Sequence, residues 1–142
     1  MFTPEQFHTL EIIHARAMQG FTYTADSVEW HKTDYWEADN ALTPLTKPLR
    51  ADCEEFARKC LLAAMGQGMA ARLVVCTDET EQGHCITEVT DAAHTVAYYF
   101  DNRRRWVVTR DGLHGYTFLA VSPWNPQPGE PRPWLQVVST PA

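Results

Sequence analysis

The sequence predicts an α+β domain in which two helices precede an antiparallel sheet. Two segments carry apolar residues at helical spacing, and several short segments of alternating apolar and polar residues follow them. Short loops between these later segments favour antiparallel pairing of neighbouring strands. A chain of 142 residues with 44% hydrophobic residues can bury one ordinary core. We therefore expect residues 1–142 to form a single domain.

The first helix is expected to begin around Thr3 and to end near Gln19. Thr3 can cap the helix, Pro4 suits its first position, and Gln6 completes a capping box. Gly20 is a suitable stop. The apolar face has helical spacing and consists of Phe7, Leu10, Ile13, Ala17 and Met18. Phe2 and Phe7 are placed to form a hydrophobic staple.

Two segments lack a regular hydrophobic period. The segment from Phe21 to Arg50 accumulates aromatic residues and prolines. We expect a long ordered loop there, with room for a short helix around Ser27 to Tyr35. Ser122 to Pro133 holds five of the nine prolines, which prevents a central strand and predicts an extended surface segment.

The second helix is predicted from Asp52 to Met65. Asp52 can cap it, Glu55 follows three residues later, and Gly66 can close it. Its apolar face should pack against the sheet and consists of Cys53, Phe56, Ala57, Cys60 and Ala64.

Six strands are predicted after the second helix. Each is a short segment rich in β-branched or aromatic residues and bounded by turn residues. The first five are Ala71–Thr77, His84–Thr90, Thr95–Asp101, Trp106–Arg110 and, after the Asp111-Gly112 turn, Tyr116–Val121. The segment from Trp134 to Val138 could return as an edge strand.

Three residues in these elements can form a cysteine hydrolase triad. Cys53 lies in the first turn of a helix, where free N–H groups and a partial positive charge favour the thiolate. The acidic residues around it oppose this effect, so the activation of Cys53 must come mostly from His84. Asp101 would orient the imidazole of His84 and favour its charged form.

The expected hairpin brings the last two of these residues together. If its loop is centred between Ala92 and Ala93, residue 84 lies directly opposite residue 101, with Cβ atoms about 4.5 to 5.5 Å apart. A slip of one residue in the loop would place Phe100 or Asn102 there instead.

The other candidate side chains have simpler interpretations. Cys60 is expected in the core and Cys76 in a strand of the sheet, and Cys85 should point away from the face that carries His84. The remaining histidines have no comparable partner and are interpreted as surface or structural residues; they are His8, His14, His31, His94 and His114. A solvated hairpin tip is favoured over an acidic-substrate contact for Arg103-Arg104-Arg105.

Composition and charge argue against several classes of protein. The net charge of −6 disfavours binding to nucleic acids and to anionic membranes. The amino terminus does not have the pattern of a secretory signal, and no segment approaches the ~20 apolar residues that span a bilayer. Four cysteines without C-x-x-C spacing argue against zinc and disulfides. We expect a cytoplasmic protein with reduced thiols and an unknown oligomeric state.

The chain resembles the bacterial transglutaminase-like cysteine peptidases over roughly Trp30 to Trp106. The motifs that carry the resemblance are Asp34-Tyr35-Trp36, Asp52-Cys53-Glu54-Glu55-Phe56-Ala57, Ala71-Arg72-Leu73-Val74-Val75, Gly83-His84 and Phe100-Asp101-Asn102. The resemblance implies a papain-like fold, with the nucleophile helix packed on an antiparallel sheet. It also implies acyl-transfer chemistry through a thioester intermediate.

By this resemblance, Cys53 is the nucleophile, His84 the general base and then acid, and Asp101 the orienting carboxylate. Trp36 is implied near the oxyanion site, beside the backbone N–H of Cys53. Some members bind calcium through acidic residues beside the nucleophile. This chain has Glu55 where an Asp is usual, so we expect no required cofactor and leave calcium open.

The expected activity is cleavage of a peptide, isopeptide or other amide bond in a protein or peptide substrate. Periplasmic members of the family process large surface proteins, whereas compact versions without a signal segment resemble domains encoded by bacteriophages. Two alternatives stay open. The thioester could pass its acyl group to an amine, as in a cross-linking transglutaminase, or the fold could serve as a catalytically silent binding or assembly module.

Overall fold

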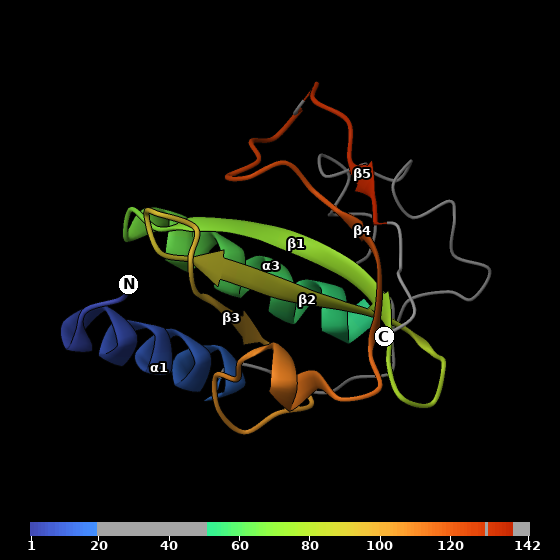
Figure 1. Ribbon diagram of the computed structural model, residues 1–142, viewed down its shortest axis with the longest axis horizontal. Helices are drawn as coiled ribbons and strands as arrows, with labels where there is room; N and C mark the ends of the chain where they lie inside the picture. Colours follow the sequence, from blue (N-terminus) through green and yellow to red (C-terminus); the bar gives the residue numbers. More distant parts are fainter. Residues whose placement is uncertain (20–50, 130, 138–142) are drawn as a thin grey trace.

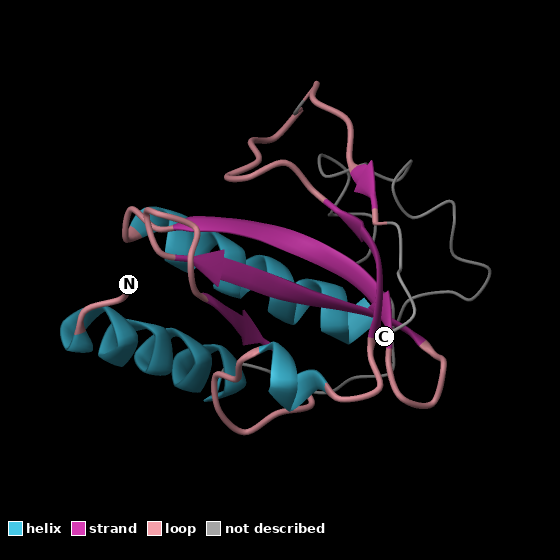
Figure 2. Ribbon diagram, in the orientation of Figure 1, coloured by secondary structure: helices cyan, strands magenta, loops and turns pink. Residues whose placement is uncertain are grey.

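In the part of the chain that the structure describes, two α-helices lie against a five-stranded antiparallel sheet (Figure 1, Figure 2). The computed structural model describes residues 1–19, 51–129 and 131–137. The helices are α1 (Pro4–Gln19) and α3 (Ala51–Gly66), and the strands are β1 (Ala70–Thr77), β2 (Gly83–Thr90), β3 (Ala97–Phe100), β4 (Thr117–Val121) and β5 (Leu135–Gln136). Their order across the sheet is β3-β2-β1-β4-β5. The predicted α+β fold, with the helix that carries Cys53 packed on an antiparallel sheet and an additional N-terminal helix, is confirmed.

The main core lies between the helices and one face of the sheet. It buries the apolar face of α3, including Phe56 and Cys60, against Leu73 of β1 and Val89 of β2. α1 packs against α3 and buries Leu10 completely. This packing places the start of α3 and the start of β2 at the same end of the sheet (Figure 1).

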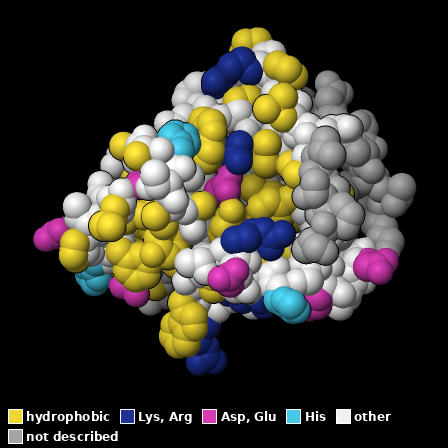
Figure 3. Space-filling view, in the orientation of Figure 1, with side chains coloured by type: hydrophobic (Ala, Val, Ile, Leu, Met, Phe, Trp, Pro, Cys, Tyr) yellow, Lys and Arg dark blue, Asp and Glu magenta, His cyan; other side chains and the backbone are white. Residues whose placement is uncertain are grey.

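The opposite face of the sheet carries a second apolar cluster that includes Val74, Ile86 and Tyr99. Within it, the Glu88 carboxylate accepts hydrogen bonds from Arg72 Nε and from the Tyr99 hydroxyl, both at 2.6 Å. Figure 3 shows this face, where apolar side chains gather with basic and acidic groups between them. Glu88 is therefore buried with both of its oxygens paired.

The start of α1 has the predicted capping box. The amide of Gln6 donates to Thr3 Oγ1 at 3.1 Å, and the amide of Thr3 donates to Gln6 Oε1 at 2.9 Å. Phe2 and Phe7 meet around the ring of Tyr98 in β3, with ring centroids 5.5 and 5.1 Å away. The aromatic pair thus attaches the start of α1 to the edge of the sheet.

The predicted strand Trp106–Arg110 is wrong. Only an isolated bridge joins Val108 to Tyr99, and a 3-10 turn, η2 (Arg110–Leu113), follows. A Cβ on Gly112 would lie 2.8 Å from the Cβ of Val108, so this tight turn requires glycine. Because the turn leaves the sheet edge, β4 pairs with β1 rather than with the preceding strand, which corrects the expected order of neighbours.

The predicted register of the β2–β3 hairpin is also wrong, by two residues. Thr87 pairs with Phe100, whereas the expected register would pair it with Tyr98. The turn is held by the Asp91 carboxylate, which accepts hydrogen bonds from the amides of Thr95 and Val96. These contacts close a longer turn than the one expected.

Several other expectations have a definite outcome. α3 begins at Ala51, so Asp52 lies inside the first turn rather than at the cap. The predicted edge strand forms as the short β5. The expected helix around Ser27 to Tyr35, and Trp36, lie outside the described residues. In the part of the chain that the structure describes, no helix has the length and apolar character needed to cross a membrane.

Candidate active site

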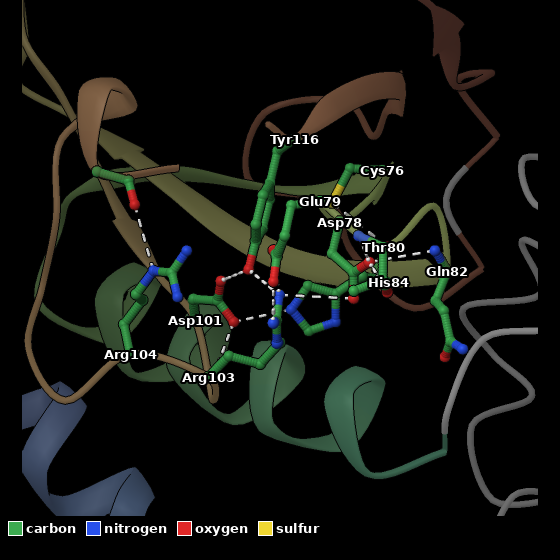
Figure 4. Close-up of polar contacts among 11 residues, drawn as sticks. Cys76, Asp78, Glu79, Thr80, Gln82, His84, Asp101, Arg103, Arg104 and Tyr116 are labelled. Carbon is green, nitrogen blue, oxygen red and sulfur yellow. Dashed lines mark hydrogen bonds and ion pairs between the residues drawn. The ribbon is translucent and has the colours of Figure 1, made fainter. Parts of the chain in front are cut away.

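His84 and Asp101 form a buried hydrogen-bonded pair (Figure 4). His84 is the second residue of β2, and Asp101 directly follows the last residue of β3. His84 Nε2 lies 2.8 Å from Asp101 Oδ1, and the two side chains are 3% and 0% exposed. An ionised carboxylate only accepts hydrogen bonds, so Nε2 donates a proton in this bond, and in the neutral ring Nδ1 is the nitrogen that can accept one.

The pair forms even though the register differs from the expected one. A displacement of two residues keeps every side chain on the same face of its strand. His84 and Asp101 therefore become diagonal neighbours instead of directly opposed ones. Diagonal positions are about 7 to 8 Å apart, a gap that long side chains can bridge.

Cys53 shares a cavity with His84. It is the third residue of α3 and is 1% exposed. The cavity has a volume of about 250 Å³ and is lined by Cys53, Asp78, Thr80, Gln82, Gly83, His84, Asn102 and Arg103. The structure thus places all three predicted triad residues at one end of the sheet, and two of them, Cys53 and His84, line a common cavity.

The Asp101 carboxylate is held by three donors. Oδ1 accepts from His84 and from the amide of Arg103 at 2.9 Å, and Oδ2 accepts from the Tyr116 hydroxyl at 2.7 Å. Burial alone would raise the pKa of Asp101, but these hydrogen bonds and the charge of His84 outweigh it and lower the pKa below its usual value. Asp101 is therefore ionised at neutral pH.

Tyr116 was not predicted to belong to the site. Its ring meets that of His84 edge to face at 5.8 Å, and its hydroxyl bonds to Asp101. Burial, followed by the neighbouring carboxylate, raises the pKa of Tyr116 well above its usual value. The phenol consequently remains a hydrogen-bond donor over the whole physiological range. Its position before β4 carried no sequence signal for this contact.

His14 also reaches the site, which the sequence interpretation missed. It lies on α1, is 1% exposed, and donates from Nε2 to the backbone carbonyl of Asp101 at 3.2 Å. Its ring packs against Phe56 and Phe100. Burial lowers the pKa of His14, and the contacts with Asp101 offset this only in part. His14 is therefore a neutral, buried support for the residue that orients His84.

Arg103 is not the freely solvated residue expected of a hairpin tip. Its guanidinium binds both carboxylate oxygens of Glu79, at 2.8 and 2.5 Å, and donates to the Tyr116 hydroxyl at 2.9 Å. Asp78 lies 3.5 Å away. The hydrogen bonds from Arg103 lower the pKa of Glu79 to about 2. Arg103 thus connects the turn after β1 with the Asp101 site.

The other three cysteines are buried, like Cys53, and none of the four belongs to a disulfide. Cys60 lies in the core under α3, and Cys76 donates from Sγ to the carbonyl of His84 at 3.6 Å. Cys85 belongs to the core beneath α3, as predicted from its position next to His84. Burial is the main reason that the pKa values of all three thiols lie above their usual range. They are therefore protonated at neutral pH.

The described side chains do not form a recognisable metal centre. Among residues 1–19, 51–129 and 131–137, no three or more His, Cys, Asp or Glu side chains are grouped closely enough to hold a metal ion. Glu54 and Glu55 flank the candidate nucleophile, and burial raises the pKa of Glu54, which weakens it as a ligand. The described residues thus do not fit a calcium site.

The arrangement of helices on a five-stranded antiparallel sheet is that of the papain/transglutaminase-like fold. Solved structures with this fold include LapG from Legionella pneumophila. An EGTA-treated form matches with a TM-score of 0.57 and 16% identity, over 80% of this chain and 61% of LapG. A calcium-bound form matches with a TM-score of 0.57 and 15% identity, over 80% of this chain and 63% of LapG.

The comparisons with LapG show the fold of this chain. The chain spans about three fifths of the LapG chains that it matches. No protein-family model matches the sequence, and no curated protein matches it.

Proposed function

We propose that this protein is a cysteine hydrolase that cleaves a peptide, isopeptide or other amide bond in a protein or peptide substrate. The observation that carries the proposal is the buried His84–Asp101 pair, 2.8 Å apart, beside a cavity that Cys53 also lines. The fold shared with LapG, a cysteine peptidase of the transglutaminase-like class, supports the same chemistry.

In the proposed reaction, the Cys53 thiol transfers its proton to His84 Nδ1, and the thiolate attacks the carbonyl carbon of the scissile bond. The resulting oxyanion lies near the N–H groups of the first turn of α3. His84 then donates its proton to the leaving amine, which leaves a thioester on Cys53. Water, deprotonated by His84, attacks the thioester and releases the acid and the free thiol.

Asp101 supports both halves of this reaction without touching the substrate. Its carboxylate fixes the Nε2–H tautomer of His84, so Nδ1 is the nitrogen that exchanges protons. The carboxylate also stabilises the imidazolium that forms after each proton transfer. Trp36 is proposed as a neighbour of the oxyanion and lies outside the described residues.

The lining of the cavity is compatible with a peptide. Asn102 contributes to it, and its Oδ1 is buried with no hydrogen-bond partner in the described part of the chain. An unpaired buried acceptor costs about 1 to 3 kcal/mol. A backbone N–H of a bound peptide would supply the missing donor if the Asn102 side chain turned its oxygen towards the cavity on binding.

The test is the pH dependence of alkylation by iodoacetamide, mapped to each cysteine by mass spectrometry. We expect Cys53 to react faster than Cys60, Cys76 and Cys85, and to do so below the pH at which an ordinary thiol ionises, because His84 stabilises its thiolate. His84→Ala should abolish this low-pH reaction, whereas the control His8→Ala on the exposed side of α1 should preserve it. Equal labelling of all four thiols would exclude the proposed catalytic role.

A further inference from the structure

A chain of polar contacts runs from the Asp101 carboxylate to the turn between β1 and β2 (Figure 4). Tyr116 donates to Asp101 Oδ2 at 2.7 Å and accepts from Arg103 Nη1 at 2.9 Å. The same guanidinium binds Glu79 through both of its terminal nitrogens. This series of contacts thus joins the partly exposed carboxylate of Glu79 to the buried carboxylate of Asp101, which pairs with His84.

The turn at the far end of this chain forms part of the cavity wall. Asp78, Thr80 and Gln82 all line the cavity. Asp78 Oδ1 organises the turn, since it accepts from the amide and hydroxyl of Thr80 at 2.8 and 2.6 Å and from the amide of Gln82 at 3.1 Å. These hydrogen bonds fix the internal shape of the turn. Its position beside Cys53 depends on contacts with other segments.

Packing and charge both supply such contacts. A Cβ on Gly115 would lie 2.8 Å from the Cβ of Glu79, so the segment before β4 approaches the turn closely. Gly115 has a φ of 85°, a conformation that favours glycine. Arg103 then joins the two segments through Glu79 and Tyr116. The guanidinium of Arg103 therefore contacts both the cavity-lining turn and Tyr116, which donates to Asp101.

We propose that Arg103 is a positioning residue that holds the cavity-lining turn through its ion pair with Glu79 and holds Tyr116 through a hydrogen bond. The balance of charge between Arg103 and Glu79 then tunes the reactivity of Cys53. This inference rests on the proposed function, because it concerns the Cys53–His84 pair. Arg103 acts through its neighbours and takes no part in bond making.

Removing the charge of Glu79 and removing the charge of Arg103 should shift the pH at which Cys53 ionises in opposite directions. Arg103 lines the cavity that Cys53 and His84 share, so its positive charge favours the thiolate and disfavours the imidazolium. Glu79 offsets that charge. Without Glu79 the thiol should ionise at lower pH, and without the Arg103 cation it should ionise at higher pH.

The other charged or titratable groups near the site keep their identity in every variant. They are Glu54, Arg58, Cys76, Asp78, His84, Cys85, Asp101, Arg104, Arg110 and Tyr116.

The experiment measures the rate of Cys53 alkylation by iodoacetamide as a function of pH. In Glu79→Gln the midpoint of the acid limb should fall by about half a pH unit, and in Arg103→Gln it should rise by a similar amount. The double variant should return close to the wild-type midpoint. Arg105→Gln is the matched control, because Arg105 is exposed and its recorded contact is with the ring of Trp106.

The outcomes separate this inference from the proposed function. If alkylation of Cys53 depends on His84 but both single variants shift the midpoint in the same direction, or only slow the reaction, Arg103 is a structural residue and the inference is wrong. If alkylation does not depend on His84, the proposed function fails and the inference fails with it. Circular dichroism melting curves confirm that each variant is folded.

Discussion

Asp101 is the residue on which the contacts of the site converge. Its carboxylate accepts hydrogen bonds from His84, from the Tyr116 hydroxyl and from the amide of Arg103. Its backbone carbonyl accepts hydrogen bonds from His14 and from the amide of Arg104. A buried carboxylate is costly unless its oxygens are paired. The donors therefore stabilise the charge and fix the direction of the carboxylate at the same time. We expect the role of Asp101 to depend on Tyr116, although Tyr116 takes no part in bond making.

Tyr116→Phe should destabilise the protein by about 1 to 3 kcal/mol, because it leaves Asp101 Oδ2 buried without its donor. It should also slow Cys53 alkylation, since a less constrained carboxylate orients His84 less well. Urea unfolding and the iodoacetamide assay measure the two effects. Tyr98→Phe is the matched control: the Tyr98 ring packs on Phe2 and Phe7, and no hydrogen bond of its hydroxyl is recorded among the described residues. Equal stability of the two variants would contradict this account.

At the scale of elements, α1 is attached to the site as well as to the core. Its start packs on β3 through Phe2 and Phe7, and His14 in its second half reaches the carbonyl of Asp101. The apolar pattern and capping box of α1 predicted the helix correctly, because those signals are local. They carried no information on His14, whose partner lies 87 residues away along the chain.

The burial of neutral His14 has a consequence for stability. Its pKa is lowered from 6.5 in the folded protein, so the unfolded chain binds the proton more tightly. The free energy of unfolding should therefore decrease as the pH falls below about 6.5 towards the lower folded pKa. His14→Gln should remove this part of the pH dependence.

Urea denaturation between pH 5 and pH 8 measures the effect of His14→Gln. His8→Gln on the same helix is the control, because His8 is exposed and its recorded partner is Glu11 at 3.7 Å. If both variants kept the slope of the wild type, His14 would not be the group responsible.

For the whole molecule, the comparison with LapG and the described side chains point to different expectations about calcium binding. A LapG structure holds calcium, whereas the described side chains of this chain contain no group of three or more ligating residues. We expect the melting temperature and the rate of Cys53 alkylation to be the same in EGTA and in millimolar calcium. Differential scanning calorimetry and the alkylation assay test this, with magnesium as the control ion. A rise in melting temperature with calcium alone would contradict the expectation.

The sequence by itself determined most of the elements, though not the segment Trp106–Arg110, and the residue types of the candidate site. The capping box fixed the start of α1, strand alternation located β1, β2 and β4, and the position of Cys53 in the first turn of α3 followed from local signals. The meeting of His84 and Asp101 was predicted from a register that proved wrong by two residues. The prediction survived because an even displacement preserves the face of a strand.

Tertiary structure alone decided which residues surround Asp101. Asp101 is contacted by Tyr116 from the segment before β4, by His14 from α1 and by the amide of Arg103 from the loop after β3. The pairing of β4 with β1 depends on a turn that leaves the sheet edge at Gly112. Such contacts join residues that are distant in sequence, and their formation depends on packing and register, whereas sequence patterns report the preferences of neighbouring residues.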